Sequence, residues 1–141
     1  MASEAARLKR LHRLERVRAI AKHEAALAAA RAEGTLAQLE ALADRTRRMV
    51  DDYQGRAQMA DGLELRQMGQ FVAGLIGISA ATSGDADQAR ALANRKQEEL
   101  ALAERRRAAV EDRAKAAAKV IEQRRQPQAL GARRAIGTAL E

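Results

Sequence analysis

The fold of this chain is decided by residues 65–121, which read LRQMGQFVAGLIGISAATSGDADQARALANRKQEELALAERRRAAVEDRAKAAAKVI. In steps of alternately three and four residues one register runs through this stretch without a break, and 13 of its 17 positions are apolar. Such spacing keeps one stripe of a helix facing a partner and is typical of coiled coils. At ~1.5 Å per residue the helix would extend over roughly 85 Å. The register positions are Leu65, Met68, Val72, Leu75, Ser79, Thr82, Ala86, Ala89, Ala93, Lys96, Leu100, Ala103, Arg107, Val110, Ala114, Ala117 and Ile121.

The composition also favours long helices over a globular core. Ala, Glu, Lys, Leu and Arg make up 88 of the 141 residues, above the roughly one half that is typical of coiled coils. Leu, Ile, Val and Phe together number only 26, too few for a compact core in a chain of this length. A disordered chain can have such a composition, but the unbroken register argues for paired helices. We therefore expect an all-α fold, an elongated antiparallel two-helix coiled-coil hairpin.

The first helix is expected over about residues 3–54, with Ser3 as its N-terminal cap. The second half of this segment has a clear register, at Leu36, Leu39, Ala43, Thr46, Val50 and Tyr53. In the first third the apolar residues come at steps of three, so their stripe drifts around the helix. This drift indicates looser pairing, or a face for another partner. The drifting residues are Leu8, Leu11, Leu14, Val17 and Ile20.

Residues 55–61, GRAQMAD, are the expected turn. Gly55 suits the left-handed conformation that often follows a helix end. Asp61 and Glu64 have the spacing of a capping box for the next helix. So short a connection makes the two helices antiparallel.

The second helix is expected over about residues 62–126, because Pro127 cannot continue a regular helix. Residues 1–126 then form the hairpin. Residues 127–141, which hold two glycines and little apolar content, are expected to be a flexible tail.

Charge is distributed unevenly along the expected hairpin. Residues 1–31 have a net charge of +5 and residues 104–134 a net charge of +6, whereas residues 32–103 carry −3. In an antiparallel hairpin the two basic segments lie together at the open end. An asymmetric field of this kind steers charged partners.

The sequence suits a soluble, cytoplasmic protein. It contains no cysteine, as is common in a reducing compartment. The N-terminus, MASEAARLKRL, lacks the apolar core of a signal peptide. The longest apolar run, residues 71–78, is far shorter than the ~20 residues of a membrane-spanning helix.

No residue pattern supports catalysis, and we expect neither a metal nor another cofactor. His12 and His23 are about three helical turns apart, too far to hold one metal ion. The side chains of Asp51 and Asp52 diverge by about 100° on a helix and do not form a catalytic pair. Residues 74–77, GLIG, match the GxxG nucleic-acid clamp only as a string, since their centre is apolar. The protein is therefore not expected to be an enzyme.

A second apolar stripe accompanies the register in the first part of the second helix. It consists of Phe71, Leu75, Ile78 and Thr82, and Ile76 adjoins it. Such a flank near the turn is either additional packing between the helices or a docking face for a partner. The spacing alone leaves both interpretations open.

Around these residues the chain resembles a known family. Residues 65–78, LRQMGQFVAGLIGI, are similar to the L-R-x-Y-x-x-F pattern and following apolar positions of FliJ, the small coiled-coil protein of flagellar type III export. The DYQ of residues 52–54 resembles the tyrosine motif that ends the first helix of that family. Length, basic balance and hairpin plan also match. Met68 and Ala57 stand where the family often has tyrosine.

The resemblance implies a soluble stalk or adaptor that links the hexameric export ATPase to the export gate and handles substrate chaperones. Members of the family resemble the shaft of a rotary ATPase, with the open end in the ring and the tip towards the gate. The location would be cytoplasmic or peripheral at the inner-membrane export apparatus. Injectisome stalk proteins are close relatives, and the residues do not separate the two systems.

The resemblance implies that the gate is contacted by Val50, Tyr53, Phe71, Leu75, Ile78 and Thr82. The charge distribution predicts that the basic open end is the one that binds the ATPase ring. The residues expected to make this contact are Arg13, Arg16, Arg105 and Arg113.

Two other classes of function stay open. One is a generic coiled-coil scaffold or homodimerising adaptor without an export role. The other is a basic rod associated with nucleic acid or ribosomes, suggested by the net charge of +7. Nucleic acid is not the expected partner, because the arginines alternate with acids and few aromatic side chains are present for base stacking.

Overall fold

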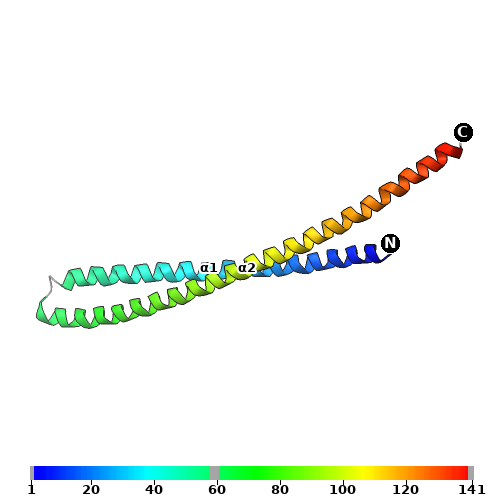
Figure 1. Ribbon diagram of the computed structural model, residues 1–141. Coiled ribbons are helices and arrows are strands. Elements are labelled where there is room, and N and C mark those ends of the chain that lie inside the picture. The colour runs from blue at the N-terminus through cyan, green and yellow to red at the C-terminus, as the bar shows by residue number, and fades with distance from the viewer. Residues whose placement is uncertain (1, 58–60, 140–141) are drawn as a thin grey trace. The chain divides into compact units, whose positions relative to one another are not determined.

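The computed structural model of this chain describes residues 2–57 and 61–139, together with the side chains of residues 3–57 and 61–126. These residues form two long helices, α1 (Ala2–Ala57) and α2 (Gly62–Ala139), and no strand is found among them (Figure 1). The helices pack against each other, and the expected all-α fold is confirmed. The chain divides into two compact units, unit 1 (Met1–Ala25 and Leu100–Glu141) and unit 2 (Ala26–Glu99).

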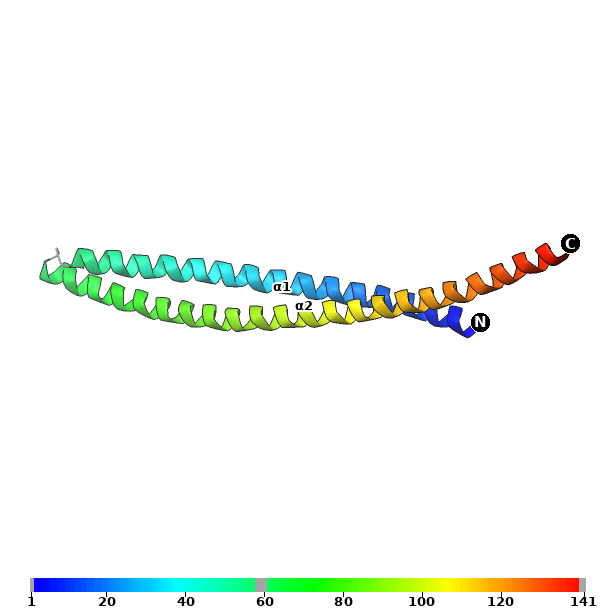
Figure 2. The same ribbon diagram turned by 45° about the horizontal axis from the view of Figure 1, so that its top comes forward.

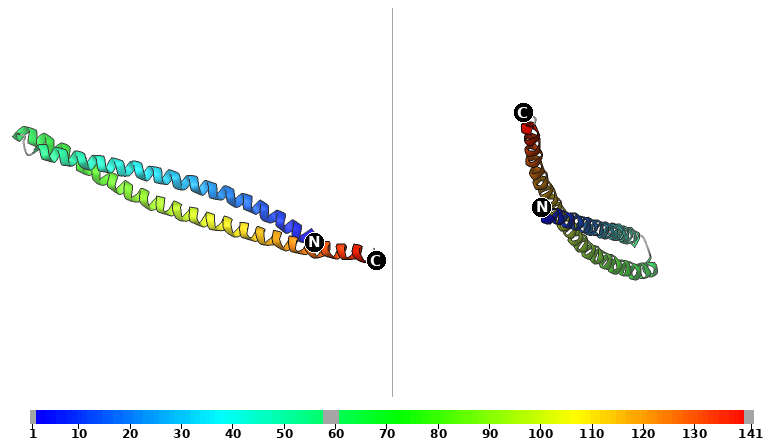
Figure 3. Two further views of the ribbon diagram at one scale, coloured as in Figure 1. Left: turned by 90° about the horizontal axis from the view of Figure 1, so that it is seen from above. Right: turned by 90° about the vertical axis from the view of Figure 1, so that its right-hand side faces the viewer.

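In unit 2, segments of α1 and α2 lie side by side and run in opposite directions (Figure 2). An ion pair of 2.7 Å joins Glu40 to Arg90, and Gln97, further along α2, donates a 3.5 Å hydrogen bond to Glu33, further back on α1. The hydrogen bond that Arg90 donates to Glu40, together with the negative charge of Glu40, raises the pKa of Arg90 above its ordinary value. The views of Figure 3 show the same side-by-side arrangement.

The core of unit 2 is a narrow line of small side chains between the two helices. Every buried residue of α2 in this unit falls on the register read from the sequence. Ala93 is the most deeply enclosed, at 1% exposure. Because alanine is short, the helix backbones can approach closely along this line. The buried residues of unit 2 are Ala29, Ala32, Thr46, Val50, Val72, Leu75, Thr82, Ala86, Ala89 and Ala93.

Two threonines are the only polar residues classed as buried among the described side chains. Thr46 and Thr82 donate their hydroxyl protons to the carbonyl oxygens of Leu42 and Ile78, four residues earlier on the same helix, at 2.8 Å. This bond satisfies a hydroxyl that would otherwise be costly to bury. The threonines therefore act as small, satisfied side chains at the interface.

In unit 1 the described residues also form two antiparallel segments, with Glu4 paired to Arg124 at one end. The drift expected for the first third of α1 is visible as exposure: Leu14, Val17 and Ile20 are 37%, 59% and 61% exposed. Partly buried residues nevertheless continue at steps of three and four, and many of them are polar. These positions are Glu4, Leu8, Leu11, Glu15, Arg18, Lys22 and Ala25.

The helix ends near the turn differ in part from the sequence-based expectation. Ser3 lies inside α1, which begins at Ala2. Gly55 does not end α1, which continues to Ala57, and no described glycine has a positive φ. The cap at Asp61 is confirmed, because its side chain accepts a 3.0 Å hydrogen bond from the backbone N–H of Glu64. The remaining turn residues, 58–60, lie outside the described residues.

Helix α2 also continues beyond its expected end. Pro127 lies within α2, which ends at Ala139 rather than near residue 126. A proline inside a helix removes one hydrogen bond and crowds the carbonyl four residues earlier, here that of Gln123. Since Arg124 already pairs with Glu4 near the start of α1, α2 extends past α1 here (Figure 1). Gln123 is an exposed residue, which allows water to satisfy its carbonyl, and the following Ala- and Arg-rich residues favour helix. The flexibility expected of residues 127–141 stays a prediction.

The narrow core generates a test of helix packing. Ala93→Leu should lower the free energy of unfolding by ~1–3 kcal/mol, because a larger side chain at a filled position forces the helices apart. The matched control is Ala91→Leu, an exposed position on the same helix, which should change stability by no more than ~0.5 kcal/mol. Thermal unfolding followed by circular dichroism measures both. Equal effects of the two variants would contradict the packing described here.

Candidate functional site

The stripe that the sequence offered as a docking face is divided by the structure. Leu75 and Thr82 are buried against α1, at 8% and 6% exposure, whereas Phe71 and Ile78 are 48% and 56% exposed. The packing interpretation therefore holds for Leu75 and Thr82, and docking through Phe71 and Ile78 stays a prediction. Val50, proposed for the same surface, is also buried. In the packed chain, these three buried side chains contribute to the contact between the helices.

Tyr53 connects the exposed part of the stripe to α1. Its ring meets that of Phe71 edge to face, with centroids 4.8 Å apart and an angle of 69° between the planes. The guanidinium of Arg56 lies over the Tyr53 ring, 5.3 Å from its centroid. The aromatic pair thus has a cation against its Tyr53 ring.

Two exposed apolar residues of α1 were missed by the sequence reasoning. Met49 is 38% exposed and lies four residues before Tyr53, on the same side of α1. Leu42 is 44% exposed and lies seven residues before Met49, again on that side. The seven-residue spacing could have revealed them. We call Leu42, Met49, Tyr53, Phe71 and Ile78 the tip patch; it contains side chains from both helices of unit 2.

Glycine leaves part of this surface bare. Gly74 stands three residues after Phe71 and four before Ile78, so it lies beside both on α2. A methyl group added at Gly74 would meet no atom within 4 Å. The glycine is therefore not required for the packing of the helices, and it keeps the space beside the two exposed side chains open.

Unit 1 differs from unit 2 in charge and in packing. It has 17 basic and 8 acidic residues, a net charge of +9, whereas unit 2 carries −2. Only Val110 and Ala114 are buried among its described side chains. The proposed ring-contacting residues all lie in this unit, and all four are exposed: Arg13, Arg16, Arg105 and Arg113.

The line between the helices of unit 1 contains charged side chains. Arg18 and Arg107 are each partly buried, and their Nε atoms are enclosed without a hydrogen-bond partner. A cavity of about 310 Å³ borders Arg107 and Glu15, and a neighbouring one of about 260 Å³ is lined by Glu15 and Glu111. Charged groups and cavities replace the small apolar contacts of unit 2. Fewer side chains are therefore fully buried between the helices in this unit.

The groups considered for catalysis are dispersed. His12 and His23 are exposed, and His12 lies 3.6 Å from Glu15. Asp51 and Asp52 are also exposed. Across the part of the chain that the structure describes, no three His, Asp or Glu side chains gather into a metal-binding group.

Neither described helix contains a stretch long and apolar enough to cross a membrane.

Comparison of the chain with models of protein families, with curated proteins and with solved structures gives no match.

The enclosed Nε atom of Arg107, which has no hydrogen-bond partner among the described residues, generates a prediction for unit 1. Arg107→Leu should raise the free energy of unfolding by about 1 kcal/mol or more, because a buried donor without a partner costs ~1–3 kcal/mol. Arg105→Leu removes the same charge from an exposed site and serves as the control. Urea unfolding followed by circular dichroism measures the difference. A loss of stability in Arg107→Leu relative to the control would show that this arginine is favourably placed.

Proposed function

We propose that this chain is the stalk of a flagellar-type type III protein export apparatus, in which its helices form an antiparallel coiled-coil hairpin. The observation that carries the proposal is the exposure of Phe71 and Ile78 within residues 65–78, the segment that resembles the FliJ family. Ile78 lies off the register, and Phe71, although its ring contacts Tyr53 within the chain, is nearly half exposed. A partner surface would cover the exposed parts of both side chains.

The tip patch is the proposed contact with the cytoplasmic domain of the export gate. Tyr53, Phe71 and Ile78 supply an aromatic and aliphatic surface of the kind that often dominates protein interfaces. Leu75, Thr82 and Val50 support this contact from below, by fixing the spacing of the two helices. Of the six residues expected to bind the gate, Tyr53, Phe71 and Ile78 would thus contact it, whereas Val50, Leu75 and Thr82 would hold the two helices in place.

Unit 1 is the proposed contact with the hexameric export ATPase. Its net charge of +9 and its exposed Arg13, Arg16, Arg105 and Arg113 complement a ring lined by acidic loops. The chain would work in the cytoplasm, at the inner-membrane export apparatus, and would pass empty substrate chaperones between export cycles.

A homodimerising scaffold is the second candidate. The exposed Val17 and Ile20 of α1 favour it, because a self-associating chain would cover such side chains. The two candidates differ in solution: the stalk is a monomer and the scaffold is a concentration-dependent dimer. Analytical ultracentrifugation separates them.

The gate contact is tested by replacing the exposed part of the patch. Phe71→Ala with Ile78→Ala should weaken binding to the gate's cytoplasmic domain by ~1–4 kcal/mol per contact residue, with little change in melting temperature. Leu75→Ala is the structural control and should cost ~2–5 kcal/mol of folding stability, because it opens a cavity between the helices. Calorimetry and circular dichroism measure the two effects. Full gate binding by the double variant would refute the proposed contact.

The ring contact is tested by charge reversal. Replacing Arg13, Arg16, Arg105 and Arg113 with Glu should abolish binding to the export ATPase, and raised salt should weaken the binding of the unchanged chain. Reversing Arg45, Arg47, Arg48 and Arg66 in unit 2 changes the net charge equally and should leave binding largely intact. Co-sedimentation with the ATPase gives the readout. If the unit 2 variant lost more ATPase binding than the unit 1 variant, the proposal that unit 1 binds the ring and unit 2 the gate would be wrong.

A further inference from the structure

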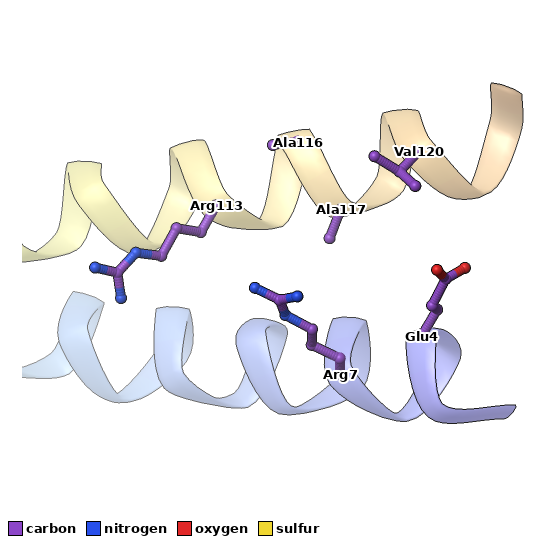
Figure 4. Close-up of a pocket in the computed structure, with 6 residues that line it drawn as sticks. All are labelled: Glu4, Arg7, Arg113, Ala116, Ala117 and Val120. Carbon is purple, nitrogen blue, oxygen red and sulfur yellow. The ribbon is translucent and has the colours of Figure 1, made fainter. Parts of the chain in front are cut away.

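One side of unit 1 combines regularly spaced arginines with exposed apolar side chains. On α1, Arg7 and Leu14 are seven residues apart, and on α2 the same spacing relates Arg106, Arg113 and Val120. Residues at this spacing share one side of a helix. A cavity of about 230 Å³ lined by Arg7, Arg113 and Val120 brings the two sets together (Figure 4). We call these five residues the Arg7 face.

The cavity has a small, apolar wall. Ala116, Ala117 and Val120 line it from α2, and Ala117 lies towards α1 (Figure 4). Val120 is 43% exposed and Leu14 is 37% exposed. Alanine at two of these positions leaves room that a larger side chain would fill. An aliphatic side chain of a partner can therefore enter here.

The charge of this face is not neutralised by the described side chains. Glu4 also lines the cavity, but its carboxylate pairs with Arg124. Among the side chains that the structure describes, neither Arg7 nor Arg113 forms an ion pair with a carboxylate. Both guanidinium groups lie in the space between the helices (Figure 4). They are placed to receive carboxylates from outside the chain.

We propose that the Arg7 face binds an acidic amphipathic helix of a partner protein as a third helix against unit 1. The seven-residue spacing from Arg7 to Leu14, and from Arg106 through Arg113 to Val120, equals the heptad spacing of such a partner. Its aliphatic residues would face Leu14 and Val120, and its carboxylates would face the arginines. A second copy of unit 1 does not fit, because its own net charge of +9 is repelled. This inference does not depend on the export role.

The test uses a designed helical peptide of three heptads, with Leu at the a and d positions and Glu at e and g, labelled for fluorescence anisotropy. The full chain should bind it, and affinity should fall as salt rises. A peptide with Lys in place of Glu, and one with Ser in place of Leu, should each bind at least tenfold more weakly. Equal binding of the Lys peptide would overturn the proposal.

Variants locate the peptide on the chain. Arg7→Glu with Arg113→Glu should weaken binding at least tenfold, whereas Arg16→Glu with Arg105→Glu, which changes the net charge equally, should weaken it no more than about threefold. Arg7→Gln with Arg113→Gln removes the two charges without adding carboxylates and should also weaken binding. Circular dichroism checks that this variant and the charge-reversed variant are both folded. Equal losses in the two reversed pairs would show a diffuse charge effect and refute the site.

Other occupants give distinguishable results. Binding of anionic lipid vesicles that depends on Arg7 and Arg113, without peptide binding, would assign the face to a membrane and overturn the proposal. If the unchanged chain dimerises and the variant with Arg7→Glu and Arg113→Glu does not, the Arg7 face would be assigned to contact with a second copy of the chain, which would overturn the proposal. Arg16 and Arg105 belong to the proposed ring contact but not to the Arg7 face. Suppose that the chain with Arg16→Glu and Arg105→Glu still binds the peptide, and that the unchanged chain does not bind the export ATPase. This result would refute the export role and leave the proposed Arg7 face intact.

Discussion

The close approach of α1 and α2 across small side chains in unit 2 is the contact on which the other features depend. A buried methyl or methylene group contributes only about 0.8 kcal/mol, so a line of alanines holds two helices only by repetition over many turns. Ala29, Ala32, Ala86, Ala89 and Ala93 provide that repetition. Because the helices approach closely here, larger side chains beside the line are left outside it. Beside the tip patch the buried line continues with Val50, Val72 and Leu75, and it leaves Phe71 and Ile78 exposed.

The sequence predicted the second helix well because its register is carried by residue size and spacing. All the buried residues of α2, from Val72 to Ala114, fall on the predicted positions. The first third of α1 was harder, since Glu15, Arg18 and Lys22 occupy its interior positions and an apolar count does not detect them. The end of α2 was also missed, because the rule that proline ends a helix applies least where water can satisfy the freed carbonyl.

For the candidate site, the sequence identified a segment that contains exposed apolar side chains, but it did not separate the exposed residues from the buried ones. Leu75 and Thr82 were already register positions, so their burial could have been predicted, and Phe71 and Ile78 could then have been assigned to the surface. The contribution of α1 could not be predicted from α2 alone. The contact of Tyr53 with Phe71 depends on which turns of the two helices are opposite each other, and this alignment is set by packing along the whole of unit 2.

The charged line inside unit 1 has a consequence for motion. Proteins open locally where few apolar contacts resist opening, and each region has its own free energy of opening. When the helix segments of unit 1 separate, the enclosed Nε atoms of Arg18 and Arg107 become hydrated. When the segments of unit 2 separate, the buried alanines lose their packing contacts. We therefore expect unit 1 to open transiently at a lower free-energy cost than unit 2. Backbone amides of its helices should then exchange with solvent sooner, and proteases should cleave first at its basic residues.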